Sequence, residues 1–531
     1  MKRLTALLLI ALCPGVALAA PPPGFAEKAD AVRAQAGVPG MAIAIVENGK
    51  ATMVRGFGHR RVGGGTVDVH TIFPTGSTGK AFTTAALATL VDAGRISWDD
   101  KVIDHLPYFR MYDHWVTGEM TIRDLLVHRS GLGLGQGDLL FVPRGKVSRA
   151  ELVRRLRYLK PATSFRSGYA YDNVLYAVAG QLVEAVSGQP WEDYVRDHVL
   201  QPAAMIDSTT DNDRRFRIAN RAYPHARTQQ PVRGLGPLSR LDERDELGRA
   251  AAPAGGLAIS ASDMAKWLRL QLAHGKLPDG TRLFSEAQHE AMWTPEVIQP
   301  IAPVSPALQL TRPNFDTYAL GWEVRDYRGA KVVWHAGGVL GFQSIVVLLP
   351  EKDVGFSVEI NSEDSEVLFG LMYDLLDHYL DLPSADWPAR FAADYKARRE
   401  KAAVALAQEQ AKPADAGPSL PLQRYAGLYH DDWYGDIRIE QGDGGLSIDF
   451  LSTPRMQGRL EHWQYDSFVT RFTDQTIEPA YVTFALDADG KVERITLKAV
   501  SPLADFSFDY HDLLFRPVPQ DADQETGRAP D

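Results

Sequence analysis

Apolar runs of strand length stand at both ends of the first part of the chain. Residues 41–46 (MAIAIV) and 51–54 (ATMV) flank Asn48 and Gly49, two residues that tolerate positive φ and favour a tight hairpin. Similar runs return much later, with a turn at Pro350 before the last, at residues 331–334, 343–349 and 354–360. We therefore expect one sheet built from both ends of this region.

A helical middle separates these runs. Residues 82–93 are rich in Ala and Leu, and Gly94 follows them. Further on, apolar side chains recur every three or four positions, with Gly188 after them, at Leu175, Val178, Leu182 and Val186. The pattern predicts an α/β (α+β) domain over residues 20–385, with a helical lobe beside the sheet.

A second unit follows a linker. This linker, residues 386–421, contains an Ala-, Glu- and Lys-rich stretch over 396–412, expected to be a helical, solvated spacer, and ends in a segment with Pro, Gly and Ser over 413–421. Residues 422–517 then show short alternating strands with turns at 442–445 and 487–490, which predicts an all-β barrel or sandwich. The polar residues 518–531 are expected to be disordered.

The N-terminal 19 residues have the pattern of an export signal. Lys2 and Arg3 precede an apolar run over residues 4–12, and Ala17-Leu-Ala19 has the small residues of a cleavage site. The single cysteine, Cys13, lies inside this segment. No other apolar run approaches the roughly 18 residues of a membrane span. We expect a protein exported to a bacterial periplasm, with no membrane span.

Composition narrows the classes of function. The 531 residues carry 57 Lys and Arg against 67 Asp and Glu, a net charge of −10, which argues against nucleic acid as a partner. One cysteine excludes a disulfide scaffold, a Cys-ligated zinc site and an iron–sulfur cluster. No His-x-x-x-His pair is present, so we expect neither a metal nor another cofactor.

The most informative segment is residues 73–82 (FPTGSTGKAF). It is no phosphate-binding loop, because Ala81 follows Lys80 where Ser or Thr is needed, and no nucleophile elbow, because Thr75 replaces the first Gly. What remains is Ser77-x-x-Lys80 at a helix start, where both side chains share one face. A lysine in a dry site can lose its proton and act as a base. The alternative is a serine that caps the helix and a solvated lysine.

Two further motifs carry candidate chemistry. Tyr171 and Asn173 precede the helix near residue 174, where a phenol can shuttle protons and an amide can orient a carbonyl. Helix capping by Asn173 or Asp172 and simple packing of Tyr171 are the alternative. His335 ends the strand 331–334 and is followed by Gly337 and Gly338, whose backbone N–H groups can face an oxyanion.

Ser77-x-x-Lys80, Tyr171-x-Asn173 and His335-x-Gly337, in that order, resemble the three motifs of the serine β-lactamase and penicillin-binding-protein superfamily. The branch is the class C group, which includes DD-carboxypeptidases, D-aminopeptidases and esterases. The likeness covers about residues 27–380 and includes the stretches 68–73, 121–132, 252–257 and 318–322. It implies an antiparallel sheet with a helical lobe. Residues 425–429 (YAGLY) resemble the lipocalin-like barrel often appended to such hydrolases.

The resemblance also implies roles for the site residues. Ser77 would be the acylated nucleophile and Lys80 its partner. Tyr171 would relay protons to the leaving group, and Asn173 would hold the substrate amide. The backbone N–H groups of Ser77 and Gly338 would form the oxyanion hole, beside Gly337 and His335.

His335 stands where a true class C β-lactamase carries lysine, which argues against efficient β-lactam turnover. The resemblance implies an exported serine hydrolase that cleaves a small peptide or amide through an acyl-enzyme. Its substrates would be peptides with D- or otherwise unusual residues, such as linearised microcystin, which peptidases of similar size and export signal cleave. The alternatives are a DD-carboxypeptidase or an esterase and, from another class, a penicillin-binding sensor or a cell-wall-binding protein without turnover.

Overall fold

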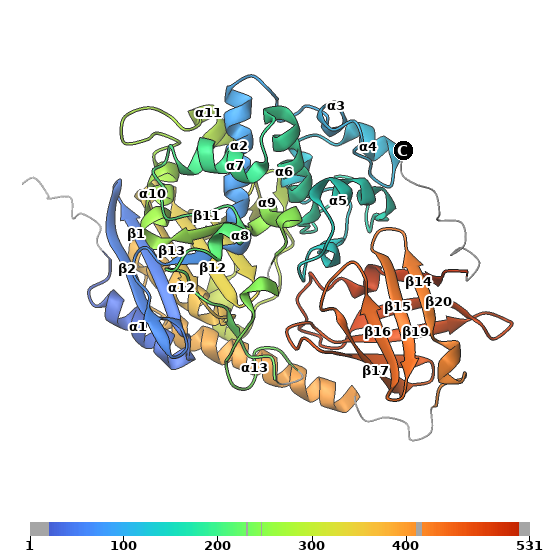
Figure 1. Cartoon of the computed structure of the whole chain (residues 1–531). Helices are drawn as coiled ribbons and strands as arrows, with labels where there is room; N and C mark the ends of the chain where they lie inside the picture. Colours follow the sequence, from blue (N-terminus) through green and yellow to red (C-terminus); the bar gives the residue numbers. More distant parts are fainter. Residues whose placement is uncertain (1–20, 230–231, 246, 410–416, 520–531) are drawn as a thin grey trace, which may run out of the picture.

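The computed structural model describes residues 21–229, 232–245, 247–409 and 417–519. The predicted signal peptide, most of the predicted tail and part of the predicted linker lie outside these ranges. Figure 1 shows two bodies, a larger one with a sheet and helices and a smaller β-barrel, with the long helix α13 running between them.

The larger body is built on a nine-stranded sheet in the order β3-β2-β1-β13-β12-β11-β10-β9-β8. Its strands are β1 (Gly40–Glu47), β2 (Lys50–Arg61), β3 (Gly64–Thr66), β8 (Val297–Ile298), β9 (Asp316–Tyr318), β10 (Glu323–Tyr327), β11 (Ala330–Val339), β12 (Phe342–Leu349) and β13 (Val354–Ile360). Strand β1 pairs antiparallel with β13, so that Met41 lies opposite Ile360. The expected sheet from both ends of this region is confirmed.

The hairpin between β1 and β2 forms where the sequence predicts it. Asn48 has φ 48° and Gly49 has φ 71°, both in the left-handed region that a two-residue hairpin turn requires. Glu47 pairs with Lys50 across this turn. The two strands then continue side by side along the sheet.

Helices cover both faces of the sheet. The bounds are α1 (Phe25–Ala36), α2 (Lys80–Asp92), α3 (Val102–His105), α4 (His114–Glu119), α5 (Arg149–Arg155), α6 (Val174–Ser187), α7 (Trp191–Val195), α8 (Asn212–Arg215), α9 (Ala252–Gly255), α10 (Ala261–Leu272), α11 (Glu286–Trp293), α12 (Ser365–Tyr379) and α13 (Trp387–Glu409). Helices α1, α12 and the start of α13 share one apolar core with one sheet face, whereas α2, α6 and α10 belong to the core on the other. Two-stranded pairs complete the lobe: β4 (Ile72–Pro74) with β7 (Ala258–Ser260), and β5 (His225–Ala226) with β6 (Ser239–Arg240).

The C-terminal body is a closed barrel of antiparallel strands, which decides between the expected barrel and sandwich. Its strands are β14 (Gly427–Asp431), β15 (Gly435–Gly442), β16 (Gly445–Phe450), β17 (Gln457–Gln464), β18 (Ser467–Phe472), β19 (Ala480–Leu486), β20 (Val492–Ala499) and β21 (Leu514–Pro517). Pairing of β14 with β21, where Tyr429 lies opposite Pro517, closes the barrel. Both predicted turns join neighbouring strands, β15 to β16 and β19 to β20.

Helix α13 packs against the larger body, which differs from the solvated spacer expected here. It begins at Trp387, and Trp387 and Phe391 are buried against α12. Arg399 lies 2.7 Å from Glu366 of α12, and Leu406 is buried near Val232. An apolar stripe at helical spacing is the physical reason. Within the described residues, no helix combines the length and apolar character needed to cross a bilayer.

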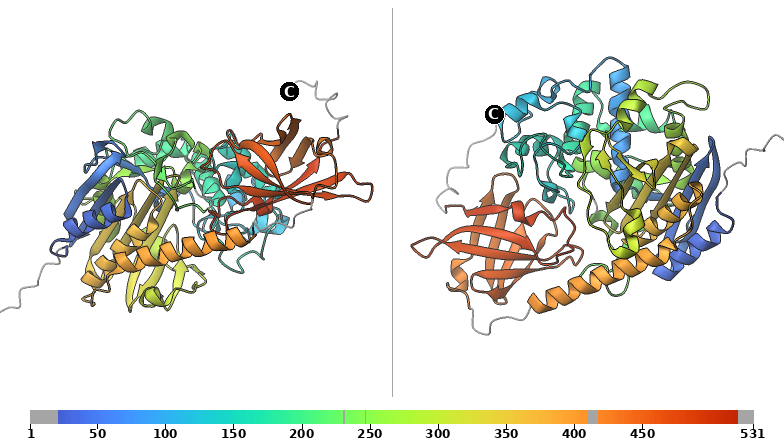
Figure 2. Two further views of the ribbon diagram at one scale, coloured as in Figure 1. Left: turned by 90° about the horizontal axis from the view of Figure 1, so that it is seen from below. Right: turned by 180° about the vertical axis from the view of Figure 1, so that it is seen from behind.

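The barrel docks directly on the larger body (Figures 1 and 2). The backbone N–H of Lys146 donates to Ser452 O at 3.0 Å, and Arg155 of α5 donates to Tyr434 O at 2.9 Å. On another side, Arg233 donates to the backbone oxygen of Thr476 at 2.8 Å. These contacts place loops of the barrel over the helical lobe.

The crossing of α6 and α9 generates a stability prediction. A Cβ on Gly180 of α6 would overlap the ring of Pro253 in α9. Gly180→Ala should therefore lower the free energy of unfolding by about 1–3 kcal/mol, the usual effect of overpacking. The matched control is Gly118→Ala in α4, where an added Cβ meets no atom within 4 Å. The control should be neutral or stabilising by up to about 1 kcal/mol. Equal Tm values for the two variants would contradict the packing described here.

Candidate functional site

Ser77 lies on a short 3₁₀ turn, Gly76–Gly79, that leads directly into α2. Lys80 is the first residue of that helix, and its Nζ lies 3.1 Å from Ser77 Oγ. The predicted contact between the two side chains is present. Ser77 is half-buried and lines a cavity, whereas Lys80 is fully buried. The alternative of a solvated lysine is therefore excluded.

The Lys80 amine has three oxygen neighbours. Besides Ser77 Oγ, Nζ lies 2.6 Å from Asn173 Oδ1 and 3.0 Å from the backbone oxygen of Ala254 in α9. Burial lowers the pKa of Lys80 to about 7. A neutral amine has two N–H donors, which match the two carbonyl oxygens, and one lone pair, which then faces the Ser77 hydroxyl. The geometry lets Lys80 accept the serine proton.

Asn173 precedes the first residue of α6 but does not cap that helix with its side chain. Its oxygen accepts from Lys80, and its Nδ2 donates to Asp138 Oδ2 at 2.8 Å. The capping interpretation of Asn173 is therefore wrong. The amide instead links the lysine to a buried carboxyl group.

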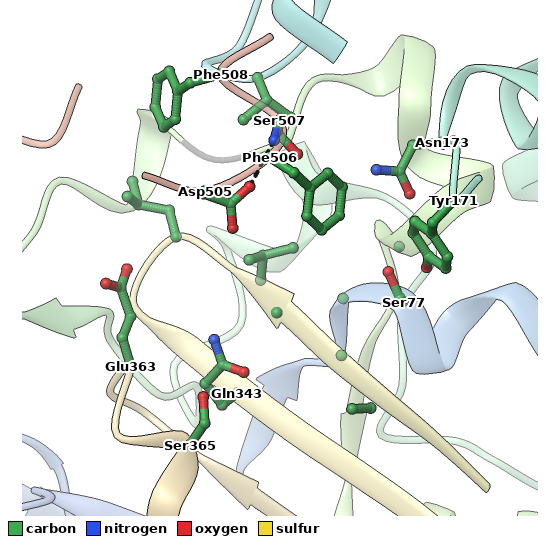
Figure 3. A pocket seen from close by; sticks show the side chains of 18 of the residues that line it. Ser77, Tyr171, Asn173, Gln343, Glu363, Ser365, Asp505, Phe506, Ser507 and Phe508 are labelled. Carbon is green, nitrogen blue, oxygen red and sulfur yellow. Dashed lines mark hydrogen bonds between the residues drawn. The ribbon is translucent and has the colours of Figure 1, made fainter. Parts of the chain in front are cut away.

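The hydroxyl of Tyr171 is buried and makes no hydrogen bond of good geometry among the described residues. Figure 3 shows it beside Ser77 at the wall of the cavity. Burial raises the pKa of Tyr171 well above its usual value of 10, and the nearby Ser77 hydroxyl partly offsets this rise. The ring lies 4.7 Å from Lys80 Nζ. Tyr171 is thus a protonated phenol close to both Ser77 and Lys80.

Strand β11 does not end at Trp334, as the sequence suggested, but continues through His335 to Val339. Gly337 in β11 and Gly76 in the turn allow the backbone of this strand to pack directly against the turn that carries Ser77. A Cβ on Gly337 would overlap the backbone oxygen of Thr75, and one on Gly76 would lie 2.6 Å from Gly338 N. Only residues without a side chain permit this approach, which brings the Gly338 N–H beside Ser77.

Both ring nitrogens of His335 bond to the protein. Nδ1 lies 2.6 Å from the backbone oxygen of Ala336, and Nε2 lies 2.8 Å from the Tyr318 hydroxyl. Because a carbonyl oxygen only accepts, Nδ1 carries the hydrogen and Nε2 accepts from Tyr318. Burial, together with the charge of Lys80, lowers the pKa of His335 to about 3. His335 therefore presents neither a free nitrogen nor a positive charge to the cavity at neutral pH.

Sequence reasoning assigned no role to several residues beside the site. His128 packs on the Tyr171 ring with centroids 4.2 Å apart, and its Nδ1 accepts from the backbone N–H of Asp172 at 3.2 Å. His128 belongs to the stretch 121–132 that carried the family resemblance, which is the signal that could have found it. Asp138 directly follows the glycine-rich residues 131–137, but nothing in the sequence places it near Lys80.

The cavity has a volume of about 750 Å³ and is lined by both bodies and by α13. The barrel contributes a loop over residues 503–508, and Figure 3 shows Phe506 of this loop reaching toward Tyr171. The two rings are 5.7 Å apart at their centroids. Leu134, Leu503 and Phe506 stay 50%, 43% and 39% exposed and make the mouth apolar.

Another part of the cavity wall is charged. Glu363 forms an ion pair of 2.6 Å with Arg233, whose guanidinium also holds the barrel at Thr476. The described part of the chain contains no group of three or more His, Cys, Asp or Glu side chains that could hold a metal ion. The side chains of Lys80 and Tyr171 lie next to Ser77.

The chain is similar to several known proteins. The family model described as Beta-lactamase matches residues 25–380, and a domain of unknown function, DUF3471, matches residues 411–517. An unguisins hydrolase of Aspergillus campestris is 29% identical over 76% of this chain and 74% of its own length. Penicillin-binding protein 4 of Amycolatopsis lactamdurans is 30% identical over 62% of this chain and 82% of its own. The octameric penicillin-binding protein homologue from Pyrococcus abyssi shares the fold, with a TM-score of 0.58, 20% identity, and coverage of 90% of this chain and 98% of its own.

The bonding of His335 generates a titration prediction. Because its pKa is lowered to about 3, the ring should stay neutral, with the hydrogen on Nδ1, from pH 8 down to about pH 4. ¹⁵N NMR of the histidine ring nitrogens measures this, and His335→Gln identifies the signal. His70, which is exposed and whose pKa is raised by Asp207, should titrate above 6.5 in the same spectra. A His335 midpoint near 6.5 would contradict the assignment.

Proposed function

The chain belongs to the Beta-lactamase family of serine hydrolases, and on that premise we propose that it cleaves amide or peptide bonds through an acyl-enzyme on Ser77. The observation that carries the proposal is the contact between Lys80 Nζ and Ser77 Oγ, 3.1 Å long and held in a buried site. The placement of Lys80 favours the neutral amine that general-base catalysis needs.

Acylation begins when Lys80 takes the proton of Ser77 and the serine oxygen attacks the substrate carbonyl. The negative charge then develops on the carbonyl oxygen, between the backbone N–H groups of Ser77 and Gly338. Asn173 stays bonded to Lys80 and Asp138 and keeps the amine aimed at the serine. Each preorganised N–H donor to the oxyanion is worth about 10²–10³ in kcat.

The leaving amine needs a proton before the C–N bond breaks. Tyr171 donates it from its buried hydroxyl and regains a proton from Lys80. In deacylation, Lys80 takes a proton from a water molecule as this water attacks the ester. The proton passes to Ser77 Oγ as the C–O bond breaks, and the free acid is released. The high pKa of the phenol keeps Tyr171 protonated between turnovers.

His335 supports this site as a positioning residue. Its ring bonds to Tyr318 and to the backbone of β11, the strand that presents Gly338. It supplies no fixed positive charge for a β-lactam carboxylate. We therefore place the enzyme among the peptidases and amidases of the class C branch, with poor β-lactam turnover.

The proposed substrates are peptides with D- or otherwise unusual residues, and linearised microcystin is the specific candidate. The cavity of about 750 Å³ has room for several residues, and its apolar mouth suits bulky side chains. A relative that is named as a hydrolase of unguisins supports a search among such natural products. Export to a bacterial periplasm is proposed on the predicted signal peptide.

Replacing the nucleophile tests the reaction. Ser77→Ala should lower kcat/KM by at least about 10³-fold with the fold intact, because the hydroxyl that forms the acyl-enzyme is gone. The assay is release of new termini from linearised microcystin, a D-Ala-D-Ala peptide, an ester and a β-lactam, followed by mass spectrometry. Circular dichroism checks the fold.

The matched control is Ser365→Ala, which removes a hydroxyl from another wall of the same cavity (Figure 3) and should change kcat/KM by less than about threefold. Full activity of Ser77→Ala would refute the mechanism. Hydrolysis of the ester alone would favour an esterase, and labelling of Ser77 without turnover would favour a penicillin-binding sensor.

The pH dependence tests Lys80 as the base. Since neutral Lys80 is the active form and its pKa is about 7, kcat/KM should rise tenfold per pH unit below about 7 and level off above it. Lys80→Ala should abolish acylation, whereas Lys266→Ala, at a half-buried lysine bound to Asp263, should keep the profile. A rate independent of pH between 5 and 9 would exclude Lys80 as the base.

A further inference from the structure

The barrel reaches into the site through the segment Ser507–Asp509. The Ser507 hydroxyl donates to Asp138 Oδ2 at 2.8 Å. The Asp509 carboxyl group accepts from the backbone N–H of Gly137 at 2.7 Å and of Leu139 at 3.2 Å, the two residues that flank Asp138. The barrel thus binds both the side chain of Asp138 and the backbone on either side of it.

Asp138 is in turn linked to the proposed base through one residue, Asn173. Asn173 Nδ2 donates to Asp138 Oδ2, and Asn173 Oδ1 accepts from Lys80 Nζ at 2.6 Å. We propose that Ser507 and Asp509 are positioning residues of the active site, which hold Asp138 and through it set the placement and the charge of Lys80. This inference rests on the proposed function and goes beyond it by giving the barrel a part in the chemistry.

The direction of every hydrogen bond in this chain supports the inference. Ser507 and Asn173 both donate to the same oxygen of Asp138, which is the arrangement that stabilises a carboxylate. Burial raises the pKa of Asp138, whereas these two bonds and the charge of Lys80 lower it and favour the carboxylate. A negative Asp138 favours the ammonium form of Lys80, whereas a neutral Asp138 favours the free amine.

Other titratable groups face this pair and enter the same balance. Those that act on Lys80 or Asp138, or are acted on by them, are His128, Tyr171, Asp172, His335, Asp505 and Asp509. The hydroxyl of Ser507 is uncharged and touches Asp138 directly. Its removal therefore deletes one hydrogen bond and leaves the number of ionisable groups the same.

The test measures how fast a fluorophosphonate labels Ser77 in the full-length protein between pH 5 and 9. Ser507→Ala removes a hydrogen bond that stabilises the negative charge of Asp138. With less negative charge nearby, Lys80 should lose its proton more readily. The rise of the labelling rate with pH should shift to lower pH by about 0.5 unit. Ser507→Thr keeps the hydroxyl and should restore the wild-type profile. Ser467→Ala, whose hydroxyl contacts Thr483 within the barrel, should also leave it unchanged.

A second variant shows whether Ser507 acts through Asp138. Asp138→Asn removes the charge altogether and should shift the profile in the same direction by about one to two pH units. In that background, Ser507→Ala should add no further shift. If the contact between Ser507 and Asp138 only tethers the barrel, Ser507→Ala should lower Tm or the labelled fraction. The pH profile of its labelling rate should then match that of the wild type.

The outcomes separate this inference from the proposed function. If Ser77 of the unaltered protein takes no label, the proposed function fails. If Ser77 is labelled and the profile is the same in Ser507→Ala and Asp138→Asn, the inference fails alone. A shift of the Ser507→Ala profile to higher pH would also overturn the inference. So would an effect of Ser507→Ala that persists in the Asp138→Asn background.

Discussion

The burial of the Lys80 amine beside the Ser77 hydroxyl is the interaction on which the rest of the site depends. An ammonium group loses its hydration when it is buried, and this cost lowers the pKa of Lys80 to about 7. The same contact in water would leave the lysine charged and unable to take a proton. Oxygens of Ser77, Asn173 and Ala254 replace water around the amine, and in the proposed mechanism this arrangement directs the lone pair of Lys80 to the serine hydroxyl.

That burial needs walls from distant parts of the chain. Helix α9 supplies the Ala254 oxygen, the start of α6 supplies Asn173, and β11 closes the site with two glycines that bring its backbone against the Ser77 turn. The barrel adds a wall of its own, since Phe506 packs near Tyr171 and Ser507 bonds to Asp138. The appended body therefore forms part of the cavity wall.

Position 335 shows how a familiar motif can change its function within the same fold. A histidine in this place suggests a group that could contact substrate, but Tyr318 and the backbone of Ala336 occupy both of its nitrogens. The ring is neutral because burial disfavours its charged form. The strand keeps its geometry while the cavity loses the fixed charge that a lysine would provide.

The sequence by itself determined the elements whose pattern is local. Asn48-Gly49 specified a hairpin, alternating residues specified the barrel strands, and the i, i+3 spacing of Ser77 and Lys80 put the two side chains in contact. Only the tertiary structure decided that β11 continues past Trp334, that α13 packs, and that Ser507 meets Asp138 across 369 positions. Such contacts depend on how folded elements from distant parts of the chain pack together, and the pKa of Lys80 depends on the burial that this packing creates. No local pattern of residues encodes the contacts or the pKa.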